Sequence, residues 1–147
     1  MSQRESGMVG VIGVGRMGAG IARSLQRAGF AIAVRDIIPE DDTSLYDAVL
    51  FGVNTVKQRA DPDHINAVVI LTDGQDTHSS ATAAQVMSTL RAQGQAESAA
   101  VRVFTIAYGQ DAQEQELERF ATASGGKCFP ADTGDIAAVY RSISSFF

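Results

Sequence analysis

A glycine-rich turn near the N-terminus is the first group of residues whose types and spacing could do chemistry. Residues 9–18 read Val-Gly-Val-Ile-Gly-Val-Gly-Arg-Met-Gly, which has the G-x-G-x-x-G spacing. Gly13 permits a tight turn out of a strand, Gly15 lets the backbone approach a pyrophosphate, and Gly18 allows the next helix to pack closely. The free N–H groups that open such a helix favour a phosphate. The stretch therefore predicts a phosphate-binding loop made of Gly13, Val14, Gly15, Arg16, Met17 and Gly18.

An acidic residue follows the second apolar stretch, where a ribose contact is expected. A carboxylate at Asp36 would accept hydrogen bonds from the ribose of an adenosine, and it would repel the 2′-phosphate of NADP. Neighbouring Arg35 weakens this preference for NAD. We expect weak binding of NAD or another adenine nucleotide, because Asp73 would add a second carboxylate near the pyrophosphate. The alternative is that the glycines only form a tight turn between a strand and a helix.

Apolar stretches of strand length alternate with stretches of helical period along the chain, and these elements must position the loop. The expected strands are residues 8–12, 30–34, 67–71, 101–107 and 127–130. The expected helices are residues 17–28, 43–58, 80–93, 112–124 and 135–146. This alternation predicts an α/β, Rossmann-like three-layer αβα sandwich, with a five-stranded parallel sheet of order 2-1-3-4-5. Ligands of such sheets bind at the carboxyl ends of the first and third strands, near residues 13–18 and 72–76.

Residues 8–37 resemble the opening unit of the β-hydroxyacid dehydrogenases, the 3-hydroxyisobutyrate and tartronate semialdehyde reductase group. The resemblance rests on Met-Val-Gly-Val-Ile-Gly-Val-Gly-Arg-Met-Gly-Ala-Gly-Ile-Ala at 8–22 and Val-Arg-Asp-Ile at 34–37. It implies a unit that binds the adenine half of NAD(P). It does not imply catalysis, because neither Lys57 nor Lys127 lies in a motif like that of the family's catalytic lysine. We expect no enzyme activity.

From Thr43 onward the sequence resembles the bacterial von Willebrand factor A domains instead. The resemblance rests on the order and spacing of Thr-Ser-Leu-Tyr-Asp-Ala-Val at 43–49, Ala-Val-Val-Ile-Leu-Thr-Asp-Gly-Gln-Asp at 67–76, Val-Arg-Val-Phe-Thr-Ile-Ala-Tyr-Gly at 101–109 and Leu-Glu-Arg-Phe-Ala-Thr-Ala-Ser-Gly-Gly at 117–126. It implies a role in adhesion or complex assembly.

The same resemblance bears on metal binding. In that family a divalent cation is held by a D-x-S-x-S loop after the first strand, a threonine that opens a later helix, and the aspartate of a T-D-G turn. Thr43 and Asp73 match the last two elements, whereas the glycine turn stands where the D-x-S-x-S loop would be. One hydroxyl and one carboxylate should bind Mg²⁺ only weakly, so no metal site is expected. We expect Thr43 to cap its helix and Asp73 to shape the turn.

These two resemblances lead to a two-part interpretation of a single domain, residues 1–147. It comprises a flexible N-terminus (1–7), a Rossmann-derived βαβ unit (8–37), a junction (38–42) and a von Willebrand A-derived part (43–147). The leading hypothesis is an engineered or recombined chimera without evolved catalytic activity, which keeps a weak nucleotide-binding loop. The alternative is a von Willebrand A-type protein-interaction module with a defective metal site, whose protein partner the sequence does not identify.

Composition narrows the choice of partners. The chain of 147 residues has 17 acidic against 12 basic residues, and its basic residues are scattered. We therefore expect neither a nucleic-acid nor a membrane partner, since both need a clustered basic face. No stretch has the pattern of a signal peptide or a membrane-spanning helix, so a cytoplasmic location is expected. Cys128 is the only cysteine, which excludes a disulfide within the chain, and it is expected to be a core residue.

Overall fold

The computed structural model describes residues 8–13, 31–36, 44–72, 75–108, 113–131 and 136–145. The strands are β1 (Met8–Gly13), β2 (Ala31–Asp36), β3 (Asn66–Thr72), β4 (Val101–Tyr108) and β5 (Cys128–Ala131). The helices among these residues are α2 (Leu45–Lys57), α3 (Ala83–Gly94), α4 (Glu114–Ala123) and α5 (Ile136–Ser144). The expected helix 17–28, the N-terminal segment 1–7 and the junction 38–42 lie outside the described ranges.

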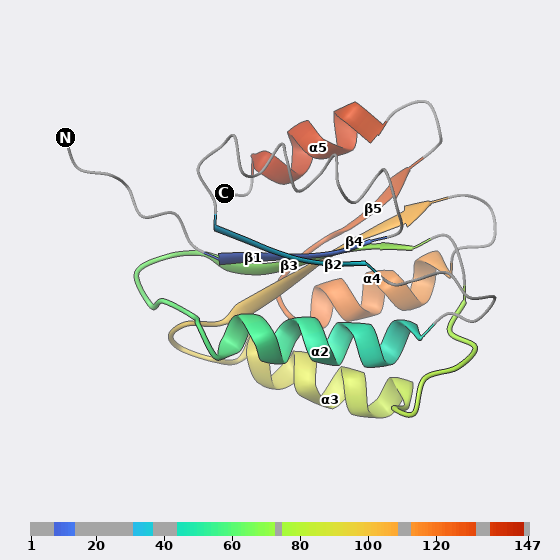
Figure 1. The fold of residues 1–147 in the computed structure, drawn as a ribbon, viewed down its shortest axis with the longest axis horizontal. Helices are drawn as coiled ribbons and strands as arrows, with labels where there is room; N and C mark the ends of the chain where they lie inside the picture. The colour runs from blue at the N-terminus through green and yellow to red at the C-terminus, as the bar shows by residue number, and fades with distance from the viewer. Residues whose placement is uncertain are drawn as a thin grey trace.

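The strands form one parallel sheet in the order β2-β1-β3-β4-β5. Figure 1 shows α5 on one face of this sheet and α2, α3 and α4 on the other. The predicted α/β class with a parallel sheet is confirmed. Since α2, α3 and α4 each connect the carboxyl end of one parallel strand to the amino end of the next, their N-termini gather near the carboxyl edge of the sheet.

The element boundaries differ from the sequence prediction by a few residues. Asp36 is the last residue of β2, rather than a residue that follows the strand. Helix α2 begins at Leu45, so its N-cap position is Ser44 and not Thr43. Helix α3 begins at Ala83 instead of Ser80, because Thr82 and Gln85 form a capping box that fixes the first turn.

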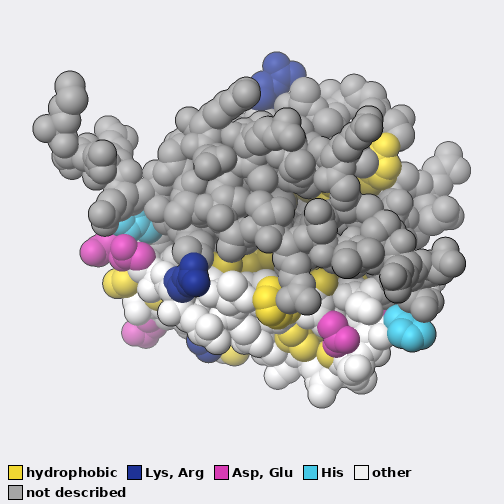
Figure 2. All heavy atoms as spheres, viewed as in Figure 1, with side chains coloured by type: hydrophobic (Ala, Val, Ile, Leu, Met, Phe, Trp, Pro, Cys, Tyr) yellow, Lys and Arg dark blue, Asp and Glu magenta, His cyan; other side chains and the backbone are white. Residues whose placement is uncertain are grey.

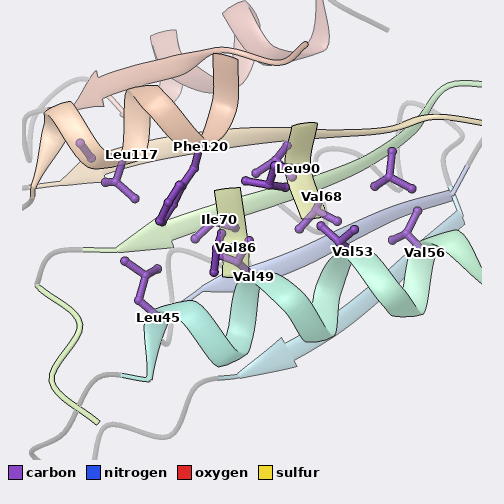
Figure 3. Packing of buried hydrophobic residues seen from close by; sticks show 13 residues of the cluster. Leu45, Val49, Val53, Val56, Val68, Ile70, Val86, Leu90, Leu117 and Phe120 are labelled. Carbon is purple, nitrogen blue, oxygen red and sulfur yellow. The ribbon is translucent and has the colours of Figure 1, made fainter. Parts of the chain in front are cut away.

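The hydrophobic cluster drawn in Figure 3 lies between the sheet and the layer of α2, α3 and α4, and Val139 and Ile143 of α5 are buried on the other face. Helix α2 contributes residues at helical spacing, namely Leu45, Val49, Val53 and Val56. All seven residues of β3 are buried, as expected for a central parallel strand covered on both faces. The cluster is completed by Val68, Ile70, Val86, Leu90, Val101, Val103, Ala107, Leu117 and Phe120.

Cys128 is half-buried and packs against this core, and burial raises the pKa of its thiol. A thiol kept protonated by an apolar environment is a poor nucleophile. Within the described ranges, no helix has the length and apolar character needed to cross a membrane.

Candidate functional site

The carboxyl ends of β1 and β2 lie side by side. Gly13 and Asp36 are partners in the β1–β2 register. Thr72 ends β3, where it is buried and pairs in register with Ala107 of β4. The structure thus places the first glycine of the predicted phosphate loop beside the backbone of the predicted ribose-binding acid. The other predicted loop residues, Val14, Gly15, Arg16, Met17 and Gly18, lie outside the described part of the chain, as do Thr43 and Asp73.

The N-terminus of α2 is capped by the β3–α3 loop (residues 75–82). The Tyr46 N–H donates to Asp76 Oδ1 at 3.1 Å, and the Asp47 N–H donates to Ser79 Oγ at 3.1 Å. Ser44, at the N-cap position, makes no side-chain cap bond. Two of the free N–H groups at the start of the helix are therefore satisfied by residues about 30 positions away in sequence.

Contacts also run in the other direction, from the loop to the helix. The Asp47 carboxylate accepts the N–H groups of Ser80 and Ala81, both at 2.9 Å. These two backbone bonds lower the pKa of Asp47, because they stabilise its ionised form. The Ser79 hydroxyl donates to Asp76 Oδ1. Hydrogen bonds therefore join the first turn of α2 and the β3–α3 loop, with donors on both sides. We call this group the interlock; its residues are Tyr46, Asp47, Asp76, Ser79, Ser80 and Ala81.

Tyr46 extends this interlock to a third element, α4. Its hydroxyl donates to Glu116 Oε1 at 2.6 Å, and its ring packs edge-to-face on Phe120 with centroids 5.9 Å apart. The hydrogen bond to Glu116 raises the pKa of Tyr46 to about 12, with further contributions from burial and from the charges of Glu116 and Asp76. Tyr46 is consequently a neutral hydrogen-bond donor at physiological pH.

The described acidic side chains at the carboxyl edge of the sheet already accept hydrogen bonds from other groups of the protein. Both oxygens of Asp47 accept backbone N–H groups, Asp76 Oδ1 accepts from Tyr46 and Ser79, and Glu116 accepts from Tyr46. A divalent cation needs several oxygen ligands, about six for Mg²⁺. Across the described ranges, no three His, Cys, Asp or Glu side chains are grouped as metal ligands. The described side chains at this edge therefore do not fit a divalent cation.

Sequence reasoning did not assign a capping role to the residues of this interlock. Ser44 and Asp47 have the S-x-x-D spacing of a capping box, which was the available signal. That signal is misleading here, because Asp47 binds the β3–α3 loop and Ser44 makes no side-chain cap bond. The Asp-Thr-His-Ser-Ser segment at 76–80 resembles a catalytic group in composition, but Asp76 and Ser79 act as caps.

Charged side chains are scattered over the described part of one face of the molecule. On the face drawn in Figure 2, the Lys and Arg side chains of the described residues stand apart from one another, as do the Asp and Glu side chains. The described part of this face therefore carries no extended basic patch.

Comparisons with known proteins agree with the second of the two resemblances. The sequence model of the von Willebrand factor type A domain matches residues 22–141. This match spans residues 38–42, and no comparison supports a dehydrogenase origin for residues 8–37. No curated protein matches the chain.

Among solved structures, the fold is similar to that of the ArnB paralog VWA2 from Sulfolobus acidocaldarius. The TM-score is 0.62 at 14% sequence identity, and the similarity covers 91% of this chain and 43% of that one. The chain therefore spans less than half the length of that protein, and the similarity is one of fold.

Proposed function

The chain belongs to the von Willebrand factor type A domain family, and from this we propose that it is a protein-interaction module without catalytic activity of its own. The observation that carries the proposal is the family match over residues 22–141. We further propose that its partner contacts do not depend on a bound divalent cation. This second part is supported by the absence of a D-x-S-x-S loop from the sequence and by the use of Asp47 and Asp76 as capping groups.

The β3–α3 loop suits a protein-interaction role because it has exposed polar residues on a backbone that is tied to α2. Gln75, Thr77 and His78 are exposed in the β3–α3 loop, which is tied to α2 at both Asp76 and Ser79. A preorganised loop loses less conformational entropy on binding than a free one. A partner at this edge would therefore meet a loop whose backbone is already fixed by the bonds of Asp76 and Ser79.

The proposal is tested by capture of partner proteins with the immobilised chain. An extract of the source organism is passed over the folded chain and over the urea-unfolded chain, in Mg²⁺ and in EDTA, and retained proteins are identified by mass spectrometry. We expect a protein that is retained by the folded chain alone and to the same extent in EDTA. Asp73→Asn and the exposed control Asp63→Asn should retain it equally.

Two results would count against this proposal in different ways. If the unfolded chain retains the same protein to the same extent, the proposed interaction function is contradicted. Retention that is lost in EDTA, or lost in Asp73→Asn while Asp63→Asn keeps it, would keep the interaction function and contradict its independence from a cation.

A second candidate function is weak binding of an adenine nucleotide at Gly13–Gly18, as in the two-part interpretation. It is favoured by the register of Gly13 with Asp36, since a dinucleotide site needs its glycine turn and its acid on neighbouring strand ends. Calorimetric titration with NAD and with ADP-ribose tests it. Binding should weaken in Asp36→Ala and strengthen in Asp73→Asn, which removes a charge near the pyrophosphate. If millimolar NAD and ADP-ribose produce no heat of binding and no shift in the melting temperature, this candidate is eliminated.

A further inference from the structure

A surface groove runs between α3 and α4, away from the interlock. It consists of two adjoining hollows of about 600 Å³ each, which share Met87, Gln115 and Arg119 in their walls. The first hollow extends to Arg91, and the second extends to Ala83 at the start of α3. Met87 is half-buried and packs against the core, so the shared part of the groove has an apolar lining.

The two hollows differ in charge. Arg91, Arg119 and Glu118 line the first hollow, whereas Glu114, Glu116 and Arg119 line the second. Glu116 is already bound by the Tyr46 hydroxyl. The guanidinium groups of Arg91 and Arg119 form no ion pair with any residue in the described ranges. The first hollow therefore has an excess of one positive charge. Because Arg119 is shared, the groove as a whole has two arginines and three glutamates, so the positive charge is confined to the first hollow.

Arg91, Arg119 and Met87 line the first hollow together, and this combination suits a ligand with a carboxylate and an aliphatic group. A guanidinium presents its N–H donors in a plane that fits a carboxylate, and charge-assisted bonds of this type are among the stronger polar contacts. Met side chains adapt their shape to aliphatic partners. Glu118 limits the attraction to about one net charge, which favours a segment with a single acidic residue over a densely acidic one.

We propose that the α3–α4 groove is a peptide-binding site. Its ligand is a segment of a partner protein that places an aliphatic side chain on Met87 and a carboxylate between Arg91 and Arg119. This inference rests on the proposed interaction function and names the surface and the ligand chemistry that serve it. The argument for this occupant is charge complementarity in the first hollow, where Arg91 and Arg119 face one glutamate, Glu118. The second hollow, with Glu114 and Glu116, does not take the carboxylate.

The test uses the full chain and a random peptide library displayed on phage. We expect selection on the wild-type chain to enrich peptides with an aspartate or glutamate next to a leucine, isoleucine or methionine. Selection on a chain with both Arg91→Gln and Arg119→Gln should lose this enrichment. Arg59→Gln, an exposed arginine in the turn after α2 and outside the groove, should keep it.

The enriched peptide is then synthesised with a fluorescein label, and its affinity is measured by fluorescence anisotropy. Arg91→Gln or Arg119→Gln should each weaken binding by roughly tenfold, as expected for the loss of a charge-assisted contact. Glu118→Gln should strengthen binding by about threefold, because it removes a like charge. All the substituted side chains are exposed, and circular dichroism verifies that the variants are folded.

Three results would overturn the groove proposal. They are enrichment without acidic residues, enrichment that persists in the double arginine variant, and the absence of any enriched peptide. Capture of a partner protein by the double arginine variant at the wild-type level would also overturn it, and would leave the proposed interaction function standing. Failure of the wild-type chain to capture any protein would remove both.

Discussion

Tyr46 connects three segments of the chain that are distant in sequence, through its N–H, its ring and its hydroxyl. Tyr46→Phe keeps the ring on Phe120 and removes the bond to Glu116. We expect the free energy of unfolding to fall by about 1 kcal/mol, the usual value of such a bond. Urea denaturation measures the change. Tyr108→Phe, at the half-buried end of β4, is the control and should be nearly neutral.

The same residue makes stability depend on pH in the alkaline range. Its pKa is raised to about 12 in the folded protein, whereas an unfolded tyrosine titrates near pH 10. The stabilisation is therefore fully present below pH ~10 and is lost as the pH rises toward 12. Tyr46 should show a late ultraviolet titration step, near pH 12. A late step that persists in Tyr46→Phe would refute the assignment.

Gly125 and Gly126, between α4 and β5, give a matched pair. Gly125 has a φ of +80° with open space where a Cβ would lie, whereas a Cβ on Gly126 would overlap the Val103 carbonyl of β4. Gly125→Ala should cost about 1 kcal/mol through backbone strain. Gly126→Ala should cost about 2–3 kcal/mol, because the backbone must shift. Thermal denaturation compares the two, and equal losses would contradict this ranking.

At the level of elements, the N-terminus of α2 depends on the β3–α3 loop. Asp76→Ala removes the acceptor of the Tyr46 N–H and should cost about 1 kcal/mol, as the loss of a helix cap does. Hydrogen exchange of the Tyr46 amide should become faster, while the exposed control Asp63→Ala leaves it unchanged. Unchanged exchange in Asp76→Ala would show that the loop does not cap the helix.

Asp47 adds an acid-range dependence to the same interlock. Because the Ser80 and Ala81 N–H groups lower its pKa, its stabilising effect is present above the pKa of an unfolded aspartate. It is lost as the pH falls through the lower value of the folded state. Asp47→Asn should therefore lessen the decline in stability on acidification, as measured by urea denaturation across the acid range.

The sequence predicts elements where the signal is local and misplaces them where it is not. The Thr82–Gln85 capping box can be read from four adjacent residues, and it marks the true start of α3. The cap of α2 cannot be read in this way, because Asp76 and Ser79 come from the loop after the next strand. The runs of Val and Ile that make up β3 and β4 were sufficient to locate both strands to within about a residue.

At the scale of the whole molecule, β1 lies between β2 and β3 in the sheet. A fragment of residues 43–147 lacks β1 and β2, so the pairing edge of β3 toward β1 would lose its partner. We expect this fragment to show no cooperative thermal transition, whereas the full chain shows one. Circular dichroism during heating makes the comparison. A cooperative transition in the fragment would mean that it is an autonomous folding unit.

The candidate sites were predictable to different extents. Gly13 and Asp36 were found from local spacing and share an edge in the structure, but a glycine turn after a parallel strand has the same spacing with or without a nucleotide. The resemblance from Thr43 onward agrees with the family match, which also covers residues before that point. The α3–α4 groove was not foreseen, because Arg91 and Arg119 are brought together only when two helices pack side by side.

The pairing of β1 with β3 also governs the order in which the molecule can assemble. Val9 must align with Ala67, and the intervening chain includes β2 and α2. During synthesis on the ribosome, β1 emerges early but cannot complete its pairing until β3 has followed. Parallel pairings between distant segments form slowly, and until then β1 leaves backbone N–H and C=O groups without their sheet partners. The interior position of β1 in the finished sheet thus means that its pairing with β3 is completed only after the chain between them has been made.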